Sequence, residues 1–73
     1  MNPYRLSSAE KFGELMRSER HRQGLSQQEV ADLAGVSVRF LGDLERGKPS
    51  CELNKSLGVA ETLGLRLVVE ERD

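Results

Sequence analysis

One short segment, VRFLGDLERGK over residues 38–48, combines cationic, anionic, aromatic and aliphatic side chains in a pattern that suits contact with another molecule. If the segment is helical and Leu41 and Leu44 face a core, the turn of about 100° per residue directs small and charged residues to the opposite side. These residues are Arg39, Gly42, Asp43 and Arg46. An arginine can donate two hydrogen bonds to O6 and N7 of guanine, and a carboxylate can accept one from N4 of cytosine. The chemistry indicated is therefore hydrogen bonding to the edges of nucleobases.

Each of these residues also has a plainer interpretation. Arg39 could be a solvated surface residue, and Asp43 could pair with Arg39 or Arg46 instead of contacting a base. Gly42 either lets the helix approach another surface closely or is only a weak helix position, which costs about 0.5–1 kcal/mol relative to alanine. Phe40 could pack in the core or offer apolar contact to a thymine methyl group.

Enzymatic chemistry has little support in the sequence. His21 has no cysteine or second histidine at the spacing that metal ligands require, so we expect no metal site. Cys51 begins a predicted helix, where a thiolate would be favoured, but a plain small side chain is the simpler interpretation. The sequence contains no serine–histidine–aspartate order, glycine-rich phosphate loop or carboxylate pair of a cleft. We therefore expect neither an enzyme nor a cofactor.

Four predicted helices would position residues 38–48, and the first of them lies before residue 24. It would begin after Ser7, with Glu10 three residues later completing a capping box. It would end near Gln23, where Gly24 follows as the C-terminal glycine.

The second and third helices would be short and joined by a tight turn. Ser26 would cap the second helix, with Glu29 completing its capping box, and Gly35 would supply the positive φ that the turn requires. Ser37 would cap the third helix, which would end near Arg46. Two short helices around such a turn form a helix-turn-helix.

A fourth helix and a strand would complete the chain. The helix would run from Ser50 to Gly64, with an apolar face made of Leu53, Leu57, Ala60 and Leu63. The segment LRLVVEE, residues 65–71, alternates in polarity and predicts a short strand. A lone strand exposes unpaired backbone groups, and NPYRL, residues 2–6, is the one candidate partner in the same chain. We therefore expect pairing with the same strand of a second copy, through Leu65, Leu67, Val68 and Val69.

Residues 24–47 contain G-L-S-Q-x-E-x-A, then A-G-V-S, then L-x-x-L-E-R-G, and this order closely resembles the Cro/C1-type (Xre) helix-turn-helix family. The resemblance covers roughly residues 12–63, and the extension LGLRLVVEE is similar to the HipB-type antitoxin branch, in which the strand pairs with its dimer mate. It implies a λ-repressor-like domain of four to five helices that binds operator DNA with an inverted repeat as a homodimer and represses transcription. It also implies a HipA-like kinase toxin as a partner.

The resemblance assigns roles to individual residues. The third helix would enter the major groove of DNA, and the helix ends beside it would contact phosphates. The residues expected to contact DNA are Gln27, Gln28, Ser37, Val38, Arg39, Phe40, Asp43, Arg46 and Lys48. Arg20 and Glu45 match family positions that form a buried structural ion pair. Leu33 stands where the family usually has a polar residue, so it could face another protein.

The composition fits one small domain. The chain has 73 residues, a net charge of −1 and a single cysteine, without an apolar run near the ~20 residues of a membrane span or an apolar signal-peptide core. We expect a cytoplasmic, nucleoid-associated protein with an N-terminal arm (1–6), a DNA-binding domain (7–64) and a dimerisation strand (65–73). Only four residues follow Val69, so we expect no toxin-binding tail. Two alternatives stay open, a stand-alone Xre regulator without a toxin and a protein-interaction module that has lost DNA binding. The near-neutral charge and the apolar Val38 and Phe40 slightly favour the interaction module.

Overall fold

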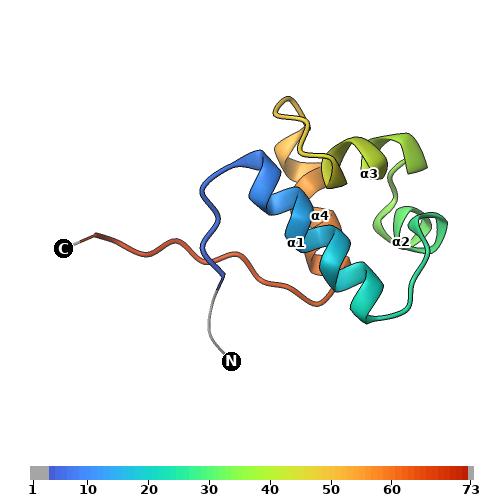
Figure 1. Cartoon of the computed structure of the whole chain (residues 1–73), viewed down its shortest axis with the longest axis horizontal. Coiled ribbons are helices and arrows are strands. Elements are labelled where there is room, and N and C mark those ends of the chain that lie inside the picture. The colour runs from blue at the N-terminus through green and yellow to red at the C-terminus, as the bar shows by residue number, and fades with distance from the viewer. Residues whose placement is uncertain (1–3, 73) are drawn as a thin grey trace.

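The computed structural model describes residues 4–72, and these residues form four α-helices and no β-strand. The helices are α1 (Ala9–Arg22), α2 (Gln27–Ala34), α3 (Val38–Glu45) and α4 (Leu53–Thr62) (Figure 1). The mainly helical fold class is therefore confirmed. None of the helices in residues 4–72 is long and apolar enough to cross a membrane. Residues 1–3 of the expected N-terminal arm and residue 73 of the expected dimerisation strand lie outside the described residues.

The start of α1 lies one residue later than the sequence predicts. Ser8, not Ser7, is the N-cap, and its hydroxyl accepts a hydrogen bond from the Lys11 amide at 3.1 Å. The third helical residue is then Lys11 and not Glu10, and a lysine cannot accept the reciprocal hydrogen bond of a capping box. The expected box is therefore wrong. The expected end is correct, because Gln23 is the C-cap and Gly24 follows it with φ 70°.

The starts of α2 and α3 agree with the prediction. The Ser26 hydroxyl accepts from the Glu29 amide at 3.1 Å, and the Glu29 carboxylate accepts from the Ser26 amide at 2.9 Å. This completes the predicted capping box. The Ser37 hydroxyl accepts from the Phe40 amide at 2.9 Å. Each cap satisfies an amide that would otherwise lack a partner at a helix start.

The start and the apolar face of α4 differ from the prediction. Its N-cap is Glu52 without a side-chain cap, because residues 49–50 form a turn and the chain does not become helical until Leu53. Ser50 is therefore not the cap. Leu53 is 69% exposed and Leu57 37% exposed, so neither belongs to the core face. Only the second half of α4 reaches the core, and the predicted end at Gly64 is correct.

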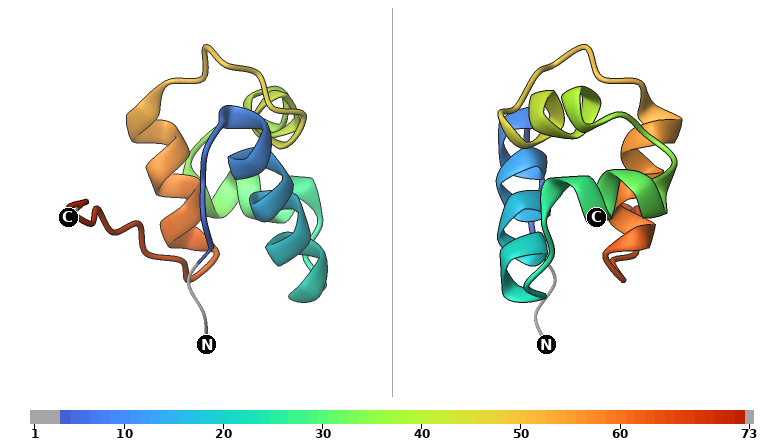
Figure 2. Two further views of the ribbon diagram at one scale, coloured as in Figure 1. Left: turned by 60° about the vertical axis from the view of Figure 1, so that its left-hand side comes forward. Right: turned by 90° about the vertical axis from the view of Figure 1, so that its right-hand side faces the viewer.

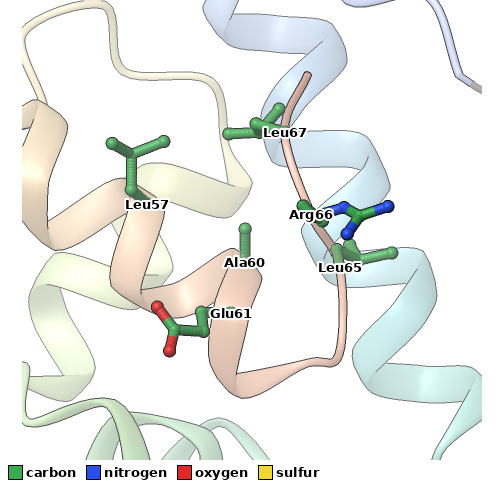
Figure 3. A pocket seen from close by; sticks show the side chains of 6 residues that line it. All are labelled: Leu57, Ala60, Glu61, Leu65, Arg66 and Leu67. Atoms are coloured by element: carbon green, nitrogen blue, oxygen red, sulfur yellow. The ribbon is translucent and has the colours of Figure 1, made fainter.

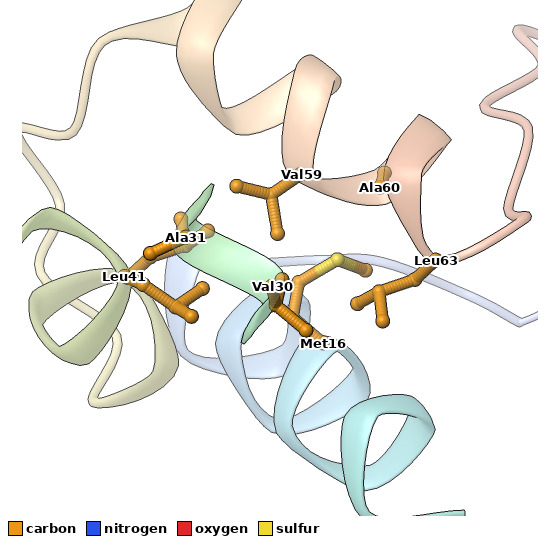
Figure 4. Close-up of a cluster of buried hydrophobic side chains, with 8 residues drawn as sticks. Met16, Val30, Ala31, Leu41, Val59, Ala60 and Leu63 are labelled. Atoms are coloured by element: carbon orange, nitrogen blue, oxygen red, sulfur yellow. The ribbon is translucent and has the colours of Figure 1, made fainter. Parts of the chain in front are cut away.

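The core is small and aliphatic (Figure 4). Its buried residues come from all four helices and the residue after α4: Met16, Val30, Ala31, Leu41, Leu44, Val59, Ala60 and Leu63. Met16, Val30 and Leu41 are at most 1% exposed, so α1, α2 and α3 are tied to one shared centre. Phe12, Leu15 and Leu25 pack at its edge. This centre fixes how α3 is presented to the outside.

Helices α1 and α3 approach each other closely at Gly13. A Cβ atom on this residue would lie 2.2 Å from the carbonyl oxygen of Leu44 and 2.9 Å from that of Glu45. No side chain fits there, because the atoms it would meet are backbone atoms that cannot move aside alone. Gly13 therefore sets the distance between α1 and the last turn of α3.

The C-terminal segment, residues 65–72, leaves the helical body as an extended chain without strand pairing (Figures 1 and 2). The Leu65 amide still donates to the Ala60 carbonyl at 2.9 Å, and Leu65 packs against the core. Beyond it the residues are exposed. A strand needs a hydrogen-bonded neighbour, and no part of residues 4–72 provides one, so the predicted strand is not formed in the single chain.

Candidate nucleic-acid interface

A tight left-handed turn joins α2 to α3. Gly35 has φ 71°, and its amide donates to the Asp32 carbonyl at 3.3 Å while the Val36 amide donates to the Ala31 carbonyl at 3.0 Å. These two bonds form a Schellman motif, which ends α2 and redirects the chain. Ala31 is fully buried where the two helices meet. The structure thus contains the helix-turn-helix that the spacing predicts, at the end of the molecule away from the C-terminus (Figure 1).

The outward face of α3 presents Arg39 and Val38. Both are exposed, and no ion pair among the described residues includes Arg39. Its guanidinium therefore keeps its five donors for an external acceptor. Gly42 is buried, because the exposed Arg46 side chain covers it, with Nη1 3.2 Å from where a Cβ would stand. In this arrangement Gly42 is not open to the close approach of another surface that the sequence suggested as one of its two roles.

Phe40 lies between the core and the surface. It is half-buried and packs against the core, and the Lys55 ammonium from α4 stands 5.8 Å from its ring centroid. That distance is within the range of a cation–π contact. Of the two roles left open for Phe40, the structure favours packing between α3 and α4. No feature of the sequence links Lys55 to Phe40, because the contact depends on how the two helices cross.

The end of α3 holds a compact group of charges. Asp43 accepts from the Arg46 guanidinium at 2.8 Å through Oδ1, and the Lys48 ammonium lies 3.6 Å from Oδ2. The hydrogen bond from Arg46, with help from the Lys48 and Arg39 charges, holds the pKa of Asp43 below its ordinary value. Asp43 therefore pairs with Arg46 and Lys48, while Arg39 acts on it only through its charge. Lys48 was expected as a DNA contact, but its pairing with Asp43 was not predicted from the sequence.

The two glutamines at the start of α2 are engaged within the chain. The Gln27 amide donates to Glu45 Oε1 at 3.0 Å, and the Gln28 amide donates to Asp32 Oδ1 at 2.8 Å. An amide nitrogen carries two hydrogens, so each side chain keeps one donor. Ser37 is exposed, but its hydroxyl oxygen serves the α3 cap. Gln27 thus contacts α3 through Glu45, and the free backbone amides of a helix start favour an anion.

Arg20 and Glu45 form the expected ion pair. Arg20 Nε donates to Oε2 at 2.7 Å and its Nη2 donates to Oε1 at 3.0 Å, in bidentate geometry with both side chains buried. Arg20 Nη1 also donates to the Leu25 carbonyl at 2.9 Å, before α2. Burial raises the pKa of Glu45, but the bonds from Arg20 and Gln27 outweigh it and hold that pKa below its ordinary value. The pair ties α1, the α2 start and α3 together.

Among residues 4–72, no group of three or more histidine, cysteine or acidic side chains is placed to hold a metal ion. The candidate surface for nucleic acid is the exposed side of α3, the start of α2 and the charges after α3.

Comparison with known proteins identifies this arrangement. A family model described as a helix-turn-helix domain matches residues 11–73. The chain belongs to this helix-turn-helix family. An HTH-type transcriptional regulator of Sinorhizobium fredii, y4mF, is 45% identical over 60 residues, which cover 82% of this chain and 79% of the relative. The transcriptional regulator ClgR of Mycobacterium tuberculosis is 39% identical over 62 residues, which cover 82% of this chain but 55% of ClgR. The helix-turn-helix chain thus spans about half the length of ClgR.

Solved structures of other helix-turn-helix proteins share the fold. A HipB–O4 20mer complex matches with a TM-score of 0.86 at 17% identity, covering 97% of this chain and 100% of the other. A HipA–HipB–O2–O3 complex matches with a TM-score of 0.87 at the same identity and coverage. The restriction-modification controller protein C.AhdI of Aeromonas hydrophila matches with a TM-score of 0.72 at 34% identity, covering 80% of this chain and 88% of that one. This helix-turn-helix protein is thus a transcriptional regulator of the Xre type with a HipB-like fold.

Proposed function

We propose that this protein is a sequence-specific transcriptional repressor that reads an inverted-repeat operator with α3. The observation that carries the proposal is the exposed Arg39 side chain, which lies outside the ion pairs of the described chain on the outer face of the second helix of the motif. Val38 beside it is apolar and 36% exposed, as a contact to a thymine methyl would require. Arg46 and Lys48 at one end, and Gln27 and Gln28 at the other, would contact the phosphates.

The active form in this proposal is a homodimer joined by the C-terminal segment. Leu67 is 43% exposed, Val68 67% and Val69 97%, which is unusual exposure for aliphatic residues in one short stretch. Leu67 and Leu65 also line an open apolar pocket beside α4, together with Leu57 and Ala60 (Figure 3). Pairing of the segment with its counterpart would satisfy its backbone groups and cover these side chains.

The favoured biological role is that of a HipB-like antitoxin that binds a HipA-like kinase toxin and represses its own operon. The HipB-like fold supports this role, and the 70% exposed Leu33 on α2 offers a contact for a protein partner. The alternative is a stand-alone Xre regulator, which the higher sequence identity to y4mF and C.AhdI favours. Co-expression with the product of the neighbouring gene separates the two roles. A stable complex with a kinase-like product supports the antitoxin, and independent elution supports the stand-alone regulator.

Fluorescence anisotropy with a duplex from the protein's own promoter tests DNA binding itself. Titration at several salt concentrations should give an affinity that falls linearly on a double-logarithmic plot, and a scrambled duplex should bind more weakly. If neither duplex binds even at low salt, the chain is better described as a protein-interaction module that has kept the fold.

A further inference from the structure

The charges that follow α3 are arranged around one carboxylate. Asp43 directs Oδ1 to Arg46 at 2.8 Å and Oδ2 to Lys48 at 3.6 Å, so each oxygen faces a different cation. The two cations are well exposed, with 71% of the Arg46 side chain and 52% of the Lys48 side chain open to solvent, while Asp43 is 24% exposed. These two basic residues are the ones that the proposed function assigns to DNA phosphates.

The backbone holds the three residues in this arrangement. The Lys48 amide donates to the Asp43 carbonyl at 3.0 Å and the Gly47 amide donates to the Leu44 carbonyl at 3.0 Å, which is a Schellman motif with Gly47 at φ 85°. A Cβ on Gly47 would lie 2.9 Å from the Cα atom of Glu10, so this turn packs directly against the start of α1. The backbone of Lys48 is therefore held near Asp43, whichever way the lysine side chain points.

A carboxylate in the last turn of a helix opposes the helix dipole, so Asp43 gains nothing from its position in α3. It also repels an approaching phosphate. A phosphate that binds Arg46 or Lys48 must first displace the Asp43 carboxylate. The free energy of this displacement offsets part of the attraction between the phosphate and the cation. The offset is the same for every DNA sequence, because phosphates carry no sequence information.

We propose that Asp43 is an internal counterion that competes with DNA phosphates for Arg46 and Lys48 and so lowers sequence-independent binding. The inference rests on the proposed function for its biological meaning. The competition between Asp43 and an external anion for the two cations, however, should occur with any polyanion. It differs from the other role considered for Asp43, acceptance of a hydrogen bond from cytosine N4, because that role would act at one base position only.

The test compares Asp43→Asn with Glu14→Gln, which removes one negative charge from an exposed site on α1. Asp43→Asn should bind a random-sequence duplex about two- to tenfold more tightly at moderate salt, since each exposed ion pair opposes binding only weakly. Its salt slope should steepen by about one, as for one more neutralised phosphate. Glu14→Gln should show little change. The gain should disappear in a background that carries Arg46→Gln and Lys48→Gln, because the cations are then absent.

Retention on a heparin column separates this inference from DNA binding. Asp43→Asn should elute at higher salt than the wild-type chain and Glu14→Gln, whether or not any duplex binds. Elution of all three proteins at the same salt concentration would overturn the inference. Weaker binding of Asp43→Asn to all duplexes would also overturn it, because that result would show that Asp43 holds the two cations in position for DNA. A change confined to one base position would instead assign Asp43 to cytosine. If heparin retention follows the prediction and no duplex binds, only the proposed function fails. Circular dichroism melting confirms that the variants are folded.

Discussion

Arg39 differs from the other basic residues near α3, because its guanidinium takes no part in the ion pairs of the described chain. Replacing Arg39 with alanine should cost about 1–3 kcal/mol on the operator and relax the preference at one base position. Anisotropy with a set of single-base operator variants measures both effects. Equal weakening on every duplex would make Arg39 a phosphate contact.

Lys48 is expected to bind DNA without sequence preference, in contrast to Arg39. Its replacement with alanine should weaken binding to all duplexes alike and lower the salt slope by up to about one, because a phosphate contact releases counterions without reading sequence. The reduction should be less than one if Asp43 already offsets part of the Lys48 charge. A salt titration of the variant beside the wild-type protein gives the slope, and a loss restricted to the operator would contradict this role.

Glu45 tests the buried ion pair. Glu45→Gln should destabilise the fold by about 3–5 kcal/mol, since it leaves the Arg20 charge buried without its partner. The pKa of Glu45 is below its ordinary value of 4.5, so the ionised form stabilises the fold above that pH and the stability is lost as the pH falls through the lower, folded value. Urea denaturation from pH 7 to 3 should show this acid-dependent loss in the wild type and a flatter profile in the variant. Parallel profiles would mean that Glu45 contributes no such dependence.

At the scale of the elements, local chemistry allowed α2, α3 and the turn between them to be predicted. Ser26 with Glu29, and Ser37, are caps whose bonds lie within three residues, and Gly35 takes a backbone conformation that favours glycine. The Arg20–Glu45 pair was expected only through the family resemblance, since 25 residues separate its partners.

Features decided by packing could not be predicted in the same way. Either of the adjacent serines Ser7 and Ser8 could cap α1, and the sequence alone did not show that the cap is Ser8. Leu53 and Leu57 stand at helical spacing from the core residues Ala60 and Leu63. They lie on the first half of α4, however, which extends beyond the core. Gly42 is covered by Arg46, whose side chain bends back to Asp43. Alternating polarity in residues 65–71 predicts an extended chain but cannot supply the neighbouring strand.

Gly13 gives a prediction about helix packing. Gly13→Ala should destabilise the protein, because overpacking costs typically about 1–3 kcal/mol and the added methyl would meet backbone carbonyls at 2.2 and 2.9 Å. Gly58→Ala in α4 is the matched control, since nothing lies within 4 Å of its added Cβ. It should stabilise by about 0.5–1 kcal/mol through helix propensity. Thermal melts should therefore shift in opposite directions, and a shared direction would contradict the close approach of α1 and α3.

At the scale of the whole molecule, the proposed dimer depends on pairing of the C-terminal segment with its counterpart. An axis near Val68 would place Arg66 opposite Glu70 of the second copy and Leu67 opposite its Val69, and an axis near Leu67 would pair Leu65 with Val69. Replacing Leu67 and Val69 together with aspartate should give a helical monomer with little affinity for the operator, because charge would be buried in the seam. Sedimentation velocity and circular dichroism test this. A variant that stays dimeric at micromolar concentration would rule out the strand-paired dimer.

The most direct test of the account is quantitative footprinting of the protein's own promoter with wild-type protein and Arg39→Ala. We expect two symmetric protected half-sites whose centres lie about one DNA turn, ~34 Å, apart, because a two-fold dimer presents two α3 helices. The preference of the wild type for this site over a scrambled duplex should shrink in Arg39→Ala. Protection without two-fold symmetry, or equal affinity of the wild type for the operator and the scrambled duplex, would contradict sequence reading by α3.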